Sequence, residues 1–350
     1  MLYLWLHYGI TMGKINQKIN GFTFDRESVT TFLRLLQKDQ WGEEELELFL
    51  STDGIRFILQ CEEWDINSLR EHMKEVGKGK ELKGAPQGTS PWNRMWANRE
   101  LIQEQHDMLE NARDETVVRA FSTVKEFFPS WNHCEGTCFF VPGGSQKTYC
   151  TQDGCAINIG MERFSPPEWR FTIASLVYRF YLFSFLGYRP QNGTQETSLK
   201  MIEMLFNITH REGLSTYVGT FAADSPELTG HYALTDEDIT LYTSAFENAL
   251  EKNSFNGEDI KPESPLTRSA TRIGHEMARA IDESGKEMGH TLGRDMLLGT
   301  LASRGFLPFF EMYRMGYPDG CITKAVWAAY DAVKKARGLH SVREDVFFMG

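Results

Sequence analysis

Hydrophobic residues recur at helical spacing along most of this chain, and strand-like patterns are confined to its middle. An apolar-periodic stretch that follows Asp25 predicts a helix at 29–36, and GEEELELFLSTDG predicts a second helix that ends at its glycine. Further helices are predicted at about 66–76 and over about 95–130. From Pro166 onward the pattern predicts four or five long helices, with no strand signal between them.

The middle of the chain predicts a small sheet. The segments CFFV and CAINI both read as short strands, and GG and DG turns lie between them. We therefore expect a small antiparallel sheet at about 134–161 in an α+β chain that is predominantly helical. The stretch KGKELKGAPQGTSPWN, rich in Gly, Lys and Pro, is the best linker candidate. It would separate an N-terminal helical region (1–85) from a core with the sheet and the C-terminal helices (95–350), unless both form one continuous domain.

The helix predicted after Pro166 contains an unusual charge. It is apolar on nearly every face, so we expect it to be central and buried. Arg179 interrupts this apolar pattern. Because a guanidinium stays charged inside a protein, Arg179 must either extend along its stem to water or meet a carboxylate within the fold.

The next helix, over about 198–218, carries a carboxylate on its apolar side. The residues of that side share helical spacing: Ile202, Leu205, Thr209, Glu212 and Thr216. Glu212 needs a cation or several hydrogen-bond donors, because an isolated buried charge is costly. Gly213 would let another backbone approach closely, and His210 points to a different face.

Composition and charge exclude some classes of partner. The chain has 350 residues and a formal net charge of −11, whereas binding to nucleic acid needs a basic face. The longest apolar run, Phe180 to Leu186, is far shorter than a membrane span. The apolar N-terminus MLYLWLHYGI lacks the basic leader and the cleavage site of a signal peptide. We therefore expect a cytoplasmic protein with neither a nucleic-acid nor a membrane partner.

Four of the six cysteines lie close together in the predicted sheet: Cys134, Cys138, Cys150 and Cys155. Their spacing allows a four-thiolate zinc site, although it is looser than that of a zinc ribbon. The alternative is a small sheet whose cysteines stay reduced, with Cys138 and Cys155 on neighbouring strands. The sequence leaves open whether this group binds a metal or forms disulfides.

Several segments resemble a family of zinc-dependent peptidases of the gluzincin type. They are FTFDRESVTTFLRLL, GEEELELFLSTDGIRFIL, the glycine-punctuated strands before residue 161, a T-I-A helix start, a later E-G pair and GHEMARAIDESGKEMGHTL. The resemblance implies a zincin-like scaffold in which T-I-A precedes the signature H-E-x-x-H and Glu212 of the E-G pair is the third zinc ligand. Residues 175–179 here read SLVYR, so both histidine ligands and the catalytic glutamate are missing. The resemblance therefore implies a degenerate HExxH motif, with no metal and no other cofactor.

This resemblance joins Arg179 and Glu212 in one hypothesis. In the resembling family the second histidine and the later glutamate converge on one metal. Arg179 is therefore expected to replace zinc as the counter-charge of Glu212, in a direct salt bridge. The pair could be structural, or it could hold a charged group in the space vacated by the metal. The expected lining of that space is Ser175, Tyr178, Thr209 and Tyr217.

Three functions are compatible with these residues. The first is a metal-independent enzyme that acts on a small or medium-sized organic molecule, through proton transfer by Glu212 or Tyr178 or charge stabilisation by Arg179. The second is a non-catalytic pseudopeptidase that binds a peptide, a metabolite or a partner protein. The third is an active zinc metallohydrolase with atypical ligands, such as His210 with Glu212. Substrate, reaction type and oligomeric state are not fixed by the sequence.

A second HExxH-like segment, which begins at His275, ends in Arg279 instead of histidine. One histidine beside a glutamate cannot supply three converging ligands, so this match is attributed to chance.

Overall fold

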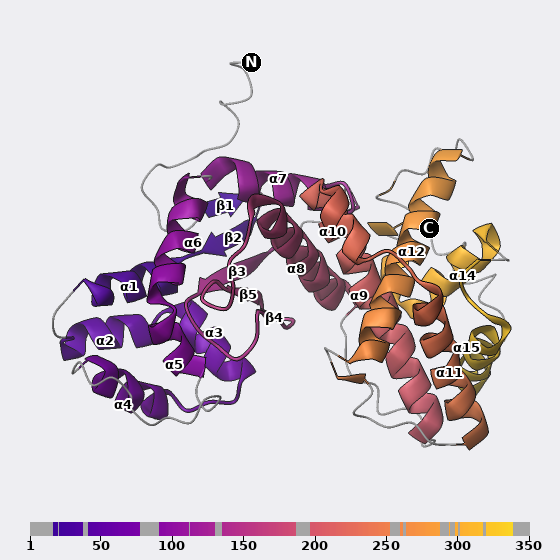
Figure 1. Cartoon of the computed structure of the whole chain (residues 1–350), viewed down its shortest axis with the longest axis horizontal. Coiled ribbons are helices and arrows are strands. Elements are labelled where there is room, and N and C mark those ends of the chain that lie inside the picture. The colour runs from indigo at the N-terminus through magenta and orange to yellow at the C-terminus, as the bar shows by residue number, and fades with distance from the viewer. Residues whose placement is uncertain are drawn as a thin grey trace, which may run out of the picture. The chain divides into compact units, whose positions relative to one another are not determined.

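A computed structural model describes most of the chain as two compact units. The described residues are 17–19, 21–37, 41–77, 91–111, 113–129, 135–186, 197–252, 260–261, 264–287, 294, 298–299, 302–317 and 320–338. The sheet unit consists of Met1–Phe121 and His133–Trp169, and the helical unit of Ser122–Asn132 and Arg170–Gly350 (Figure 1). The sheet segment thus belongs with the N-terminal helices, whereas the division expected from the sequence, 1–85 and 95–350, stays a prediction. The apolar N-terminus and most of the linker candidate lie outside the described residues.

The described residues are mostly helical and contain one small sheet, which confirms an α+β, predominantly helical fold. Within these residues no helix combines the length and the hydropathy that a membrane span requires. Two helices cross the division between the units: α7 (Arg113–Lys125) and α8 (Pro166–Leu186).

The sheet is mixed rather than antiparallel throughout. Its described strands have the order β1-β2-β3-β5-β4, and their bounds are β1 (Gln17–Ile19), β2 (Phe22–Asp25), β3 (Gly136–Val141), β4 (Thr148–Cys150) and β5 (Cys155–Asn158). The central strands β2, β3 and β5 are parallel, and β1 and β4 pair antiparallel at the two edges. The expected DG turn, at 153–154, does join β4 to β5. Strand β3, however, pairs with β5 and not with β4. Strands β1 and β2 come from outside 134–161.

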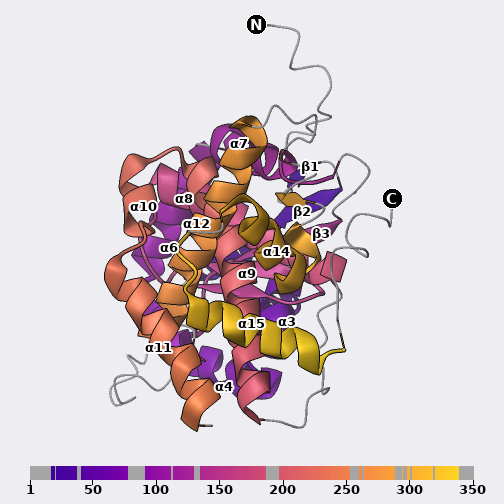
Figure 2. The same ribbon diagram turned by 90° about the vertical axis from the view of Figure 1, so that its right-hand side faces the viewer.

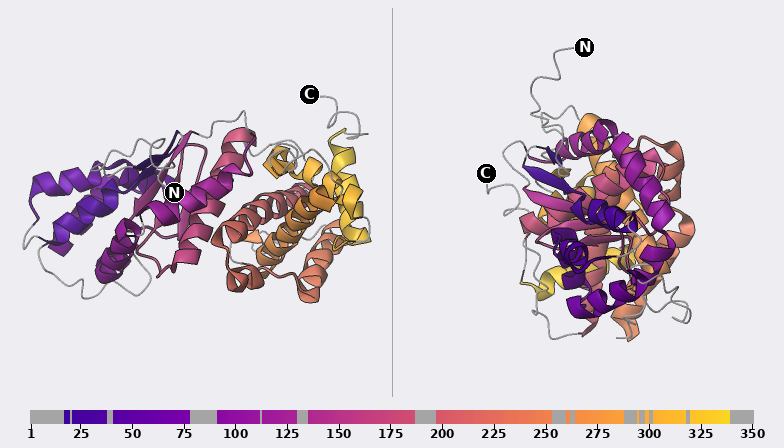
Figure 3. Two further views of the ribbon diagram at one scale, coloured as in Figure 1. Left: turned by 90° about the horizontal axis from the view of Figure 1, so that it is seen from above. Right: turned by 90° about the vertical axis from the view of Figure 1, so that its left-hand side faces the viewer.

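Helices of the sheet unit lie on both sides of this sheet (Figure 3). Aromatic side chains pack on both of its faces. Phe22 and Phe24 point to one face, where their rings lie 5.7 and 5.9 Å from the ring of Phe121 on α7. Phe139 of β3 points to the other face and lies 5.3 Å from the ring of Phe57. All four residues of β5 are buried. Burial on both faces is typical of parallel strands and explains why CAINI is apolar without strict alternation.

The other helices of the sheet unit are α1 (Glu27–Leu36), α2 (Glu43–Leu50), α3 (Asp53–Cys61), α4 (Ile66–Gly77), α5 (Pro91–Ala97) and α6 (Arg99–Asn111). The predicted second helix ends at Leu50, before its glycine, and Gly54 lies in the first turn of α3 instead. A Cβ atom at Gly54 would lie 2.4 Å from Oγ of Ser28 on α1. This glycine therefore allows α1 and α3 to pack closely, a role that a helix-termination rule does not detect.

The helical unit is built around one long helix. Besides part of α8, its described helices are α9 (Thr197–Ala223), α10 (Pro226–His231), α11 (Asp236–Lys252), α12 (Pro265–Glu287), α14 (Phe306–Gly316) and α15 (Lys324–Ala336). Helix α9 contacts α11, α12, α14 and α15, and Figure 2 shows these helices gathered about it. No described residue after Pro166 lies in a strand, as the hydrophobic pattern predicts.

Helices α8 and α9 run side by side in opposite directions. Nη2 of Arg170 near the start of α8 donates to the carbonyl of Ala223 at the end of α9, at 2.6 Å. Further along α8, Arg179 contacts Glu212, which lies about three turns earlier in α9. The expectation that these helices adjoin is therefore confirmed.

Helices α9 and α12 meet through two glycines. A Cβ atom at Gly213 would lie 2.3 Å from the backbone of Gly274, and one at Gly274 would lie 1.9 Å from the carbonyl oxygen of Thr209. The two backbones are thus in direct contact, as Gly213 predicts.

Candidate functional site

An ion pair between Arg179 and Glu212 joins the middle of α8 to the middle of α9. Nη2 of Arg179 contacts Oε2 of Glu212, and the two side chains are 26% and 18% exposed. The predicted salt bridge is thus confirmed, and Arg179 does not simply extend to water. Both side chains thus keep some exposure to solvent.

A second guanidinium contacts the same carboxylate. Nε of Arg211 donates to Oε1 of Glu212 at 3.0 Å, and the Arg211 guanidinium lies 5.0 Å from the centroid of the Phe183 ring. Burial acts to raise the pKa of Glu212, but the charges of Arg179 and Arg211 outweigh it and hold that pKa below its usual value. Glu212 is therefore ionised at neutral pH. We call Arg179, Arg211 and Glu212 the Glu212 cluster.

Arg179 retains a hydrogen-bond donor that nothing in the described residues accepts. Its Nε atom is buried and has no hydrogen-bond partner there. Buried N–H groups are almost always satisfied by protein, water or ligand atoms. The Glu212 cluster thus has the capacity to bind a further acceptor.

Tyr232, just after α10, places a phenol near this cluster. Its ring stacks on Phe171 and on His275, with centroid distances of 5.4 and 6.1 Å. Burial raises the pKa of Tyr232, and the nearby charges of Arg179 and Glu212 act on it in opposite directions. The hydroxyl is therefore protonated at neutral pH and can donate a hydrogen bond or a proton.

Neither Arg211 nor Tyr232 is among the residues predicted from the sequence. The available signal for Arg211 was its place next to a carboxylate on the apolar side of a helix. Tyr232 follows a short helix and shows no local pattern, so only the tertiary fold brings it to α8 and α12.

Ser175 and Tyr178 lie on α8 near Arg179, but their hydroxyl groups take part in other hydrogen bonds. Tyr178 is fully buried and donates to the carbonyl of Leu298 at 3.2 Å. Burial raises its pKa well above the ordinary tyrosine value. Ser175 donates to the carbonyl of Thr172 at 3.2 Å. Both side chains thus stabilise the interior around α8.

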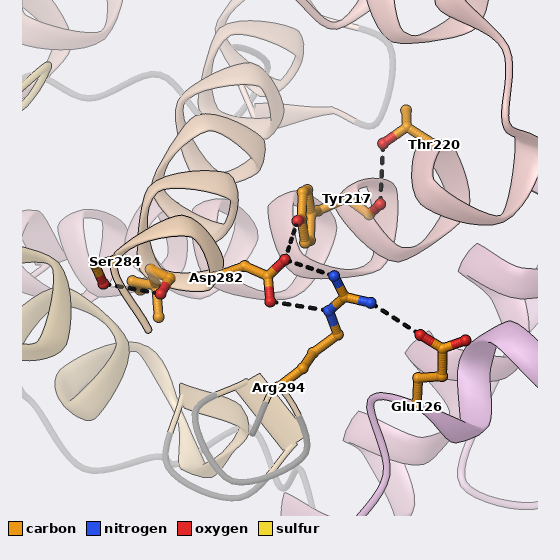
Figure 4. Close-up of polar contacts among 7 residues, drawn as sticks. Glu126, Tyr217, Thr220, Asp282, Ser284 and Arg294 are labelled. Carbon is orange, nitrogen blue, oxygen red and sulfur yellow. Dashed lines mark hydrogen bonds and ion pairs between the residues drawn. The ribbon is translucent and has the colours of Figure 1, made fainter. Parts of the chain in front are cut away.

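Thr209 and Tyr217 are likewise engaged elsewhere. Thr209 is fully buried, donates to the carbonyl of Leu205 at 2.9 Å and shares a hydrogen bond of 2.7 Å with the hydroxyl of Tyr242. Tyr217 donates to Oδ2 of Asp282 at 2.7 Å (Figure 4). Of the six predicted site residues, the structure therefore brings Arg179 and Glu212 into direct contact, and the hydroxyl groups of the other four bind other partners.

The described residues contain no group of three or more histidine, cysteine, aspartate or glutamate side chains placed to hold a metal ion. Nε2 of His210 forms a hydrogen bond of 2.7 Å with the carbonyl of Ala302, and burial lowers the His210 pKa to about 4. Arg279 pairs with Glu276 and Glu283 along the surface of α12. His210 is therefore occupied away from Glu212, and the arginine that ends the HExxH-like segment at 275–279 is paired with carboxylates.

The cysteines of the sheet follow the strand pairing. Cys138 and Cys155 are directly opposite on β3 and β5, as predicted, and Cys150 is opposite Cys155 on β4. Cys134 lies outside the described residues, so the four-thiolate arrangement is not tested. The strand register alone accounts for the closeness of the other three.

Comparison with known proteins identifies no relative: no family model, no curated protein and no solved structure matches this chain. The resemblance to zinc-dependent peptidases thus stays a prediction that rests on the quoted sequence segments.

Proposed function

We propose that this protein is a metal-independent enzyme that acts on a small organic molecule bearing a carboxylate, bound at the Glu212 cluster. The observation that carries the proposal is Arg179, whose side chain is partly exposed and whose buried Nε–H group lacks an acceptor in the described residues. Guanidinium groups bind carboxylates through charge-assisted and often paired hydrogen bonds. A carboxylate thus suits this group better than a neutral or cationic ligand.

In this proposal each group of the site has one role. Arg179 binds the ligand carboxylate, and Glu212 orients the two guanidinium groups that contact it. Tyr232 donates to a ligand oxygen on which negative charge develops. Glu212 is not assigned the role of general base, because its lowered pKa makes it a weak one.

Zinc, which the resembling peptidases bind, does not fit these residues. The resemblance would put Ser175 and Arg179 at the positions of the two histidine ligands, and neither is a usual zinc ligand. The carboxylate that would be the third ligand is already in contact with two guanidinium groups. Their charge opposes the entry of a divalent cation, so no step of the proposed reaction uses a metal.

A non-catalytic pseudopeptidase is the second candidate. The internal hydrogen bonds of Ser175, Tyr178, Thr209 and Tyr217 favour it, because they commit these hydroxyl groups to the fold. In that case the same cluster would bind the carboxylate of a metabolite or of a peptide C-terminus without changing it.

Binding of benzoate, compared with its neutral isostere benzamide, tests the site. We expect benzoate but not benzamide to raise the thermal unfolding temperature of the protein. Arg179→Gln should abolish the benzoate effect. A matched control is Arg279→Gln, which removes an arginine paired with Glu276 and Glu283 away from the cluster and should leave the effect intact. Equal responses to the two compounds, or an undiminished benzoate effect in Arg179→Gln, would contradict the proposal.

The catalytic part is tested by incubating the protein with a panel of small carboxylates and detecting conversion by mass spectrometry. We expect Tyr232→Phe to abolish conversion while benzoate binding persists. If the unaltered protein binds benzoate but converts no member of the panel, the second candidate replaces the first.

A further inference from the structure

A second charged cluster is centred on Asp282 of α12, and it surrounds one of the chain's own arginines, Arg294. Nε and Nη2 of Arg294 donate to Oδ1 and Oδ2 of Asp282 at 2.9 and 2.8 Å (Figure 4). Tyr217 donates to the same carboxylate, which is only 2% exposed. We call Asp282, Arg294, Tyr217 and Glu126 the Asp282 cluster.

The remaining surroundings of Arg294 complete a binding site for a guanidinium. Nη1 donates to Oε2 of Glu126 at 3.0 Å. The guanidinium carbon lies 4.8 Å from the ring centroid of Phe127 and 4.0 Å from that of Phe221. Proteins recognise guanidinium compounds through such groups: a carboxylate that accepts two parallel N–H bonds, a second carboxylate, and aromatic rings.

The Asp282 cluster is connected to Tyr232 by side-chain contacts. The ring of Tyr217 meets that of His275 at 5.6 Å, and Nε2 of His275 forms a hydrogen bond of 3.0 Å with Oγ1 of Thr220. The His275 ring in turn stacks on Tyr232 at 6.1 Å. One continuous series of contacts thus runs from Arg294 through Asp282, Tyr217 and His275 to Tyr232.

We infer that Arg294 is an internal ligand of a guanidinium-binding site and that its presence there positions Tyr217, His275 and Tyr232. Removing the guanidinium leaves the buried Asp282 carboxylate without its cation, so Tyr217 and its neighbours must rearrange to solvate or protonate it. Arg294 is accordingly a positioning residue. The placement of Tyr232 follows from these contacts, and only its consequence for a bound carboxylate rests on the function proposed above.

Chemical rescue of Arg294→Ala tests this inference, with methylguanidinium as the probe. We expect the variant to unfold at a lower temperature than the unaltered protein, and millimolar methylguanidinium to restore much of the difference. Tetramethylammonium, a cation without N–H donors, should restore none. If Arg294→Ala does not fold alone, it should fold in methylguanidinium and not in tetramethylammonium. Asp282→Asn in the same chain should remove the rescue.

Positioning is read from the NMR signals of the His275 ring, which are assigned by comparison with His275→Gln. We expect these signals to shift in Arg294→Ala and to return when methylguanidinium is added. Arg294→Lys keeps the charge without the planar donor pair, so it should leave the signals displaced. Absence of rescue, or rescue of stability without return of the His275 signals, would overturn the inference.

None of these measurements uses benzoate. Failure of the proposed function would thus leave them unchanged, and failure of this inference would leave benzoate binding by the unaltered protein as it is.

Discussion

The Glu212 cluster and the Asp282 cluster, which both include residues of α9, have opposite charge compositions. In the Glu212 cluster one carboxylate contacts two guanidinium groups, and a buried N–H of Arg179 has no acceptor in the described residues. In the Asp282 cluster one guanidinium contacts two carboxylates, and all three of its nitrogens donate. The first cluster is partly exposed, whereas Asp282 is almost completely buried.

This difference separates two uses of buried charge. A cluster in which every nitrogen of the guanidinium already donates to a carboxylate gains little from a further molecule, so it stabilises and positions the chain around it. A cluster that has a buried, unmatched donor on a partly exposed side chain still gains from an acceptor. The contrast indicates why we assign ligand binding to the Glu212 cluster and an internal, positioning role to the Asp282 cluster.

The largest effect is expected from Asp282→Ala. This change leaves the Arg294 guanidinium and the Tyr217 hydroxyl without their common acceptor, and breaking a buried pair in this way typically costs about 3 to 5 kcal/mol. Urea denaturation measures the loss in the free energy of unfolding. The matched control is Glu283→Ala, one residue along α12 and 47% exposed, which should change stability far less. Similar losses of stability in the two variants would contradict the stabilising role assigned to the Asp282 cluster.

Lowering the pH should destabilise the protein through His275, the histidine that contacts both Tyr217 and Tyr232. Burial lowers the pKa of His275 to about 4, below its ordinary value of about 6.5, so the unfolded chain binds a proton more readily than the folded one. Stability should therefore fall as the pH decreases from about 6.5 towards 4, by roughly 2 to 3 kcal/mol for this group.

His275→Gln should flatten the pH dependence of the unfolding free energy over this interval. It should not abolish that dependence, because burial also lowers the pKa of His210 to about 4. An unchanged slope in His275→Gln would show that the histidine titrates normally in the folded chain.

The sharing of Glu212 between two arginines predicts coupling between them. Arg179→Ala and Arg211→Ala should each be tolerated, because one cation remains in contact with the carboxylate. The double variant leaves Glu212 unpaired, so its loss of stability should exceed the sum of the single losses by about 1 kcal/mol. A double-mutant cycle in urea measures this excess, and strict additivity would mean that the two arginines stabilise the protein independently of each other.

The smallest effect, a gain of weak zinc binding, is expected from Ser175→His combined with Arg179→His. Residues 175 and 179 lie one helical turn apart, and residue 179 faces Glu212, so two histidines and a carboxylate would converge there. Zinc titration by calorimetry measures the gain. Arg294→His beside Asp282 supplies one histidine only and serves as the control. If the double variant binds zinc no better than this control, residues 175–179 do not correspond to the zinc motif of the resembling peptidases.

Much of the helical unit could be predicted because its helices are long and their patterns are strong. An arginine inside an apolar helix and a glutamate on an apolar stripe both required an opposite charge, and each supplied it for the other. The sheet was harder to predict. Strand β2 is only the segment FTFD, directly before a helix, and the parallel pairing of β3 with β5 depends on a contact that skips the intervening β4.

The Asp282 cluster and Tyr232 lay beyond prediction for a different reason. Asp282 and Arg294 are twelve residues apart on either side of a helix end, so no helical spacing relates them. Phe127 and Phe221 come from still more distant parts of the chain. Such groups are assembled by tertiary packing, and their partners are visible only once the helices are placed.

The contact between Gly213 and Gly274 affects how this protein can change over evolutionary time. Helices that are spaced by side chains drift apart or together as those side chains are exchanged. The spacing of α9 and α12 is set by main-chain atoms, so exchange of the surrounding side chains should not alter it. Glu212 adjoins one of these glycines and His275 adjoins the other. Substitutions at either position should therefore leave the spacing of the two helices unchanged, as long as both glycines are kept.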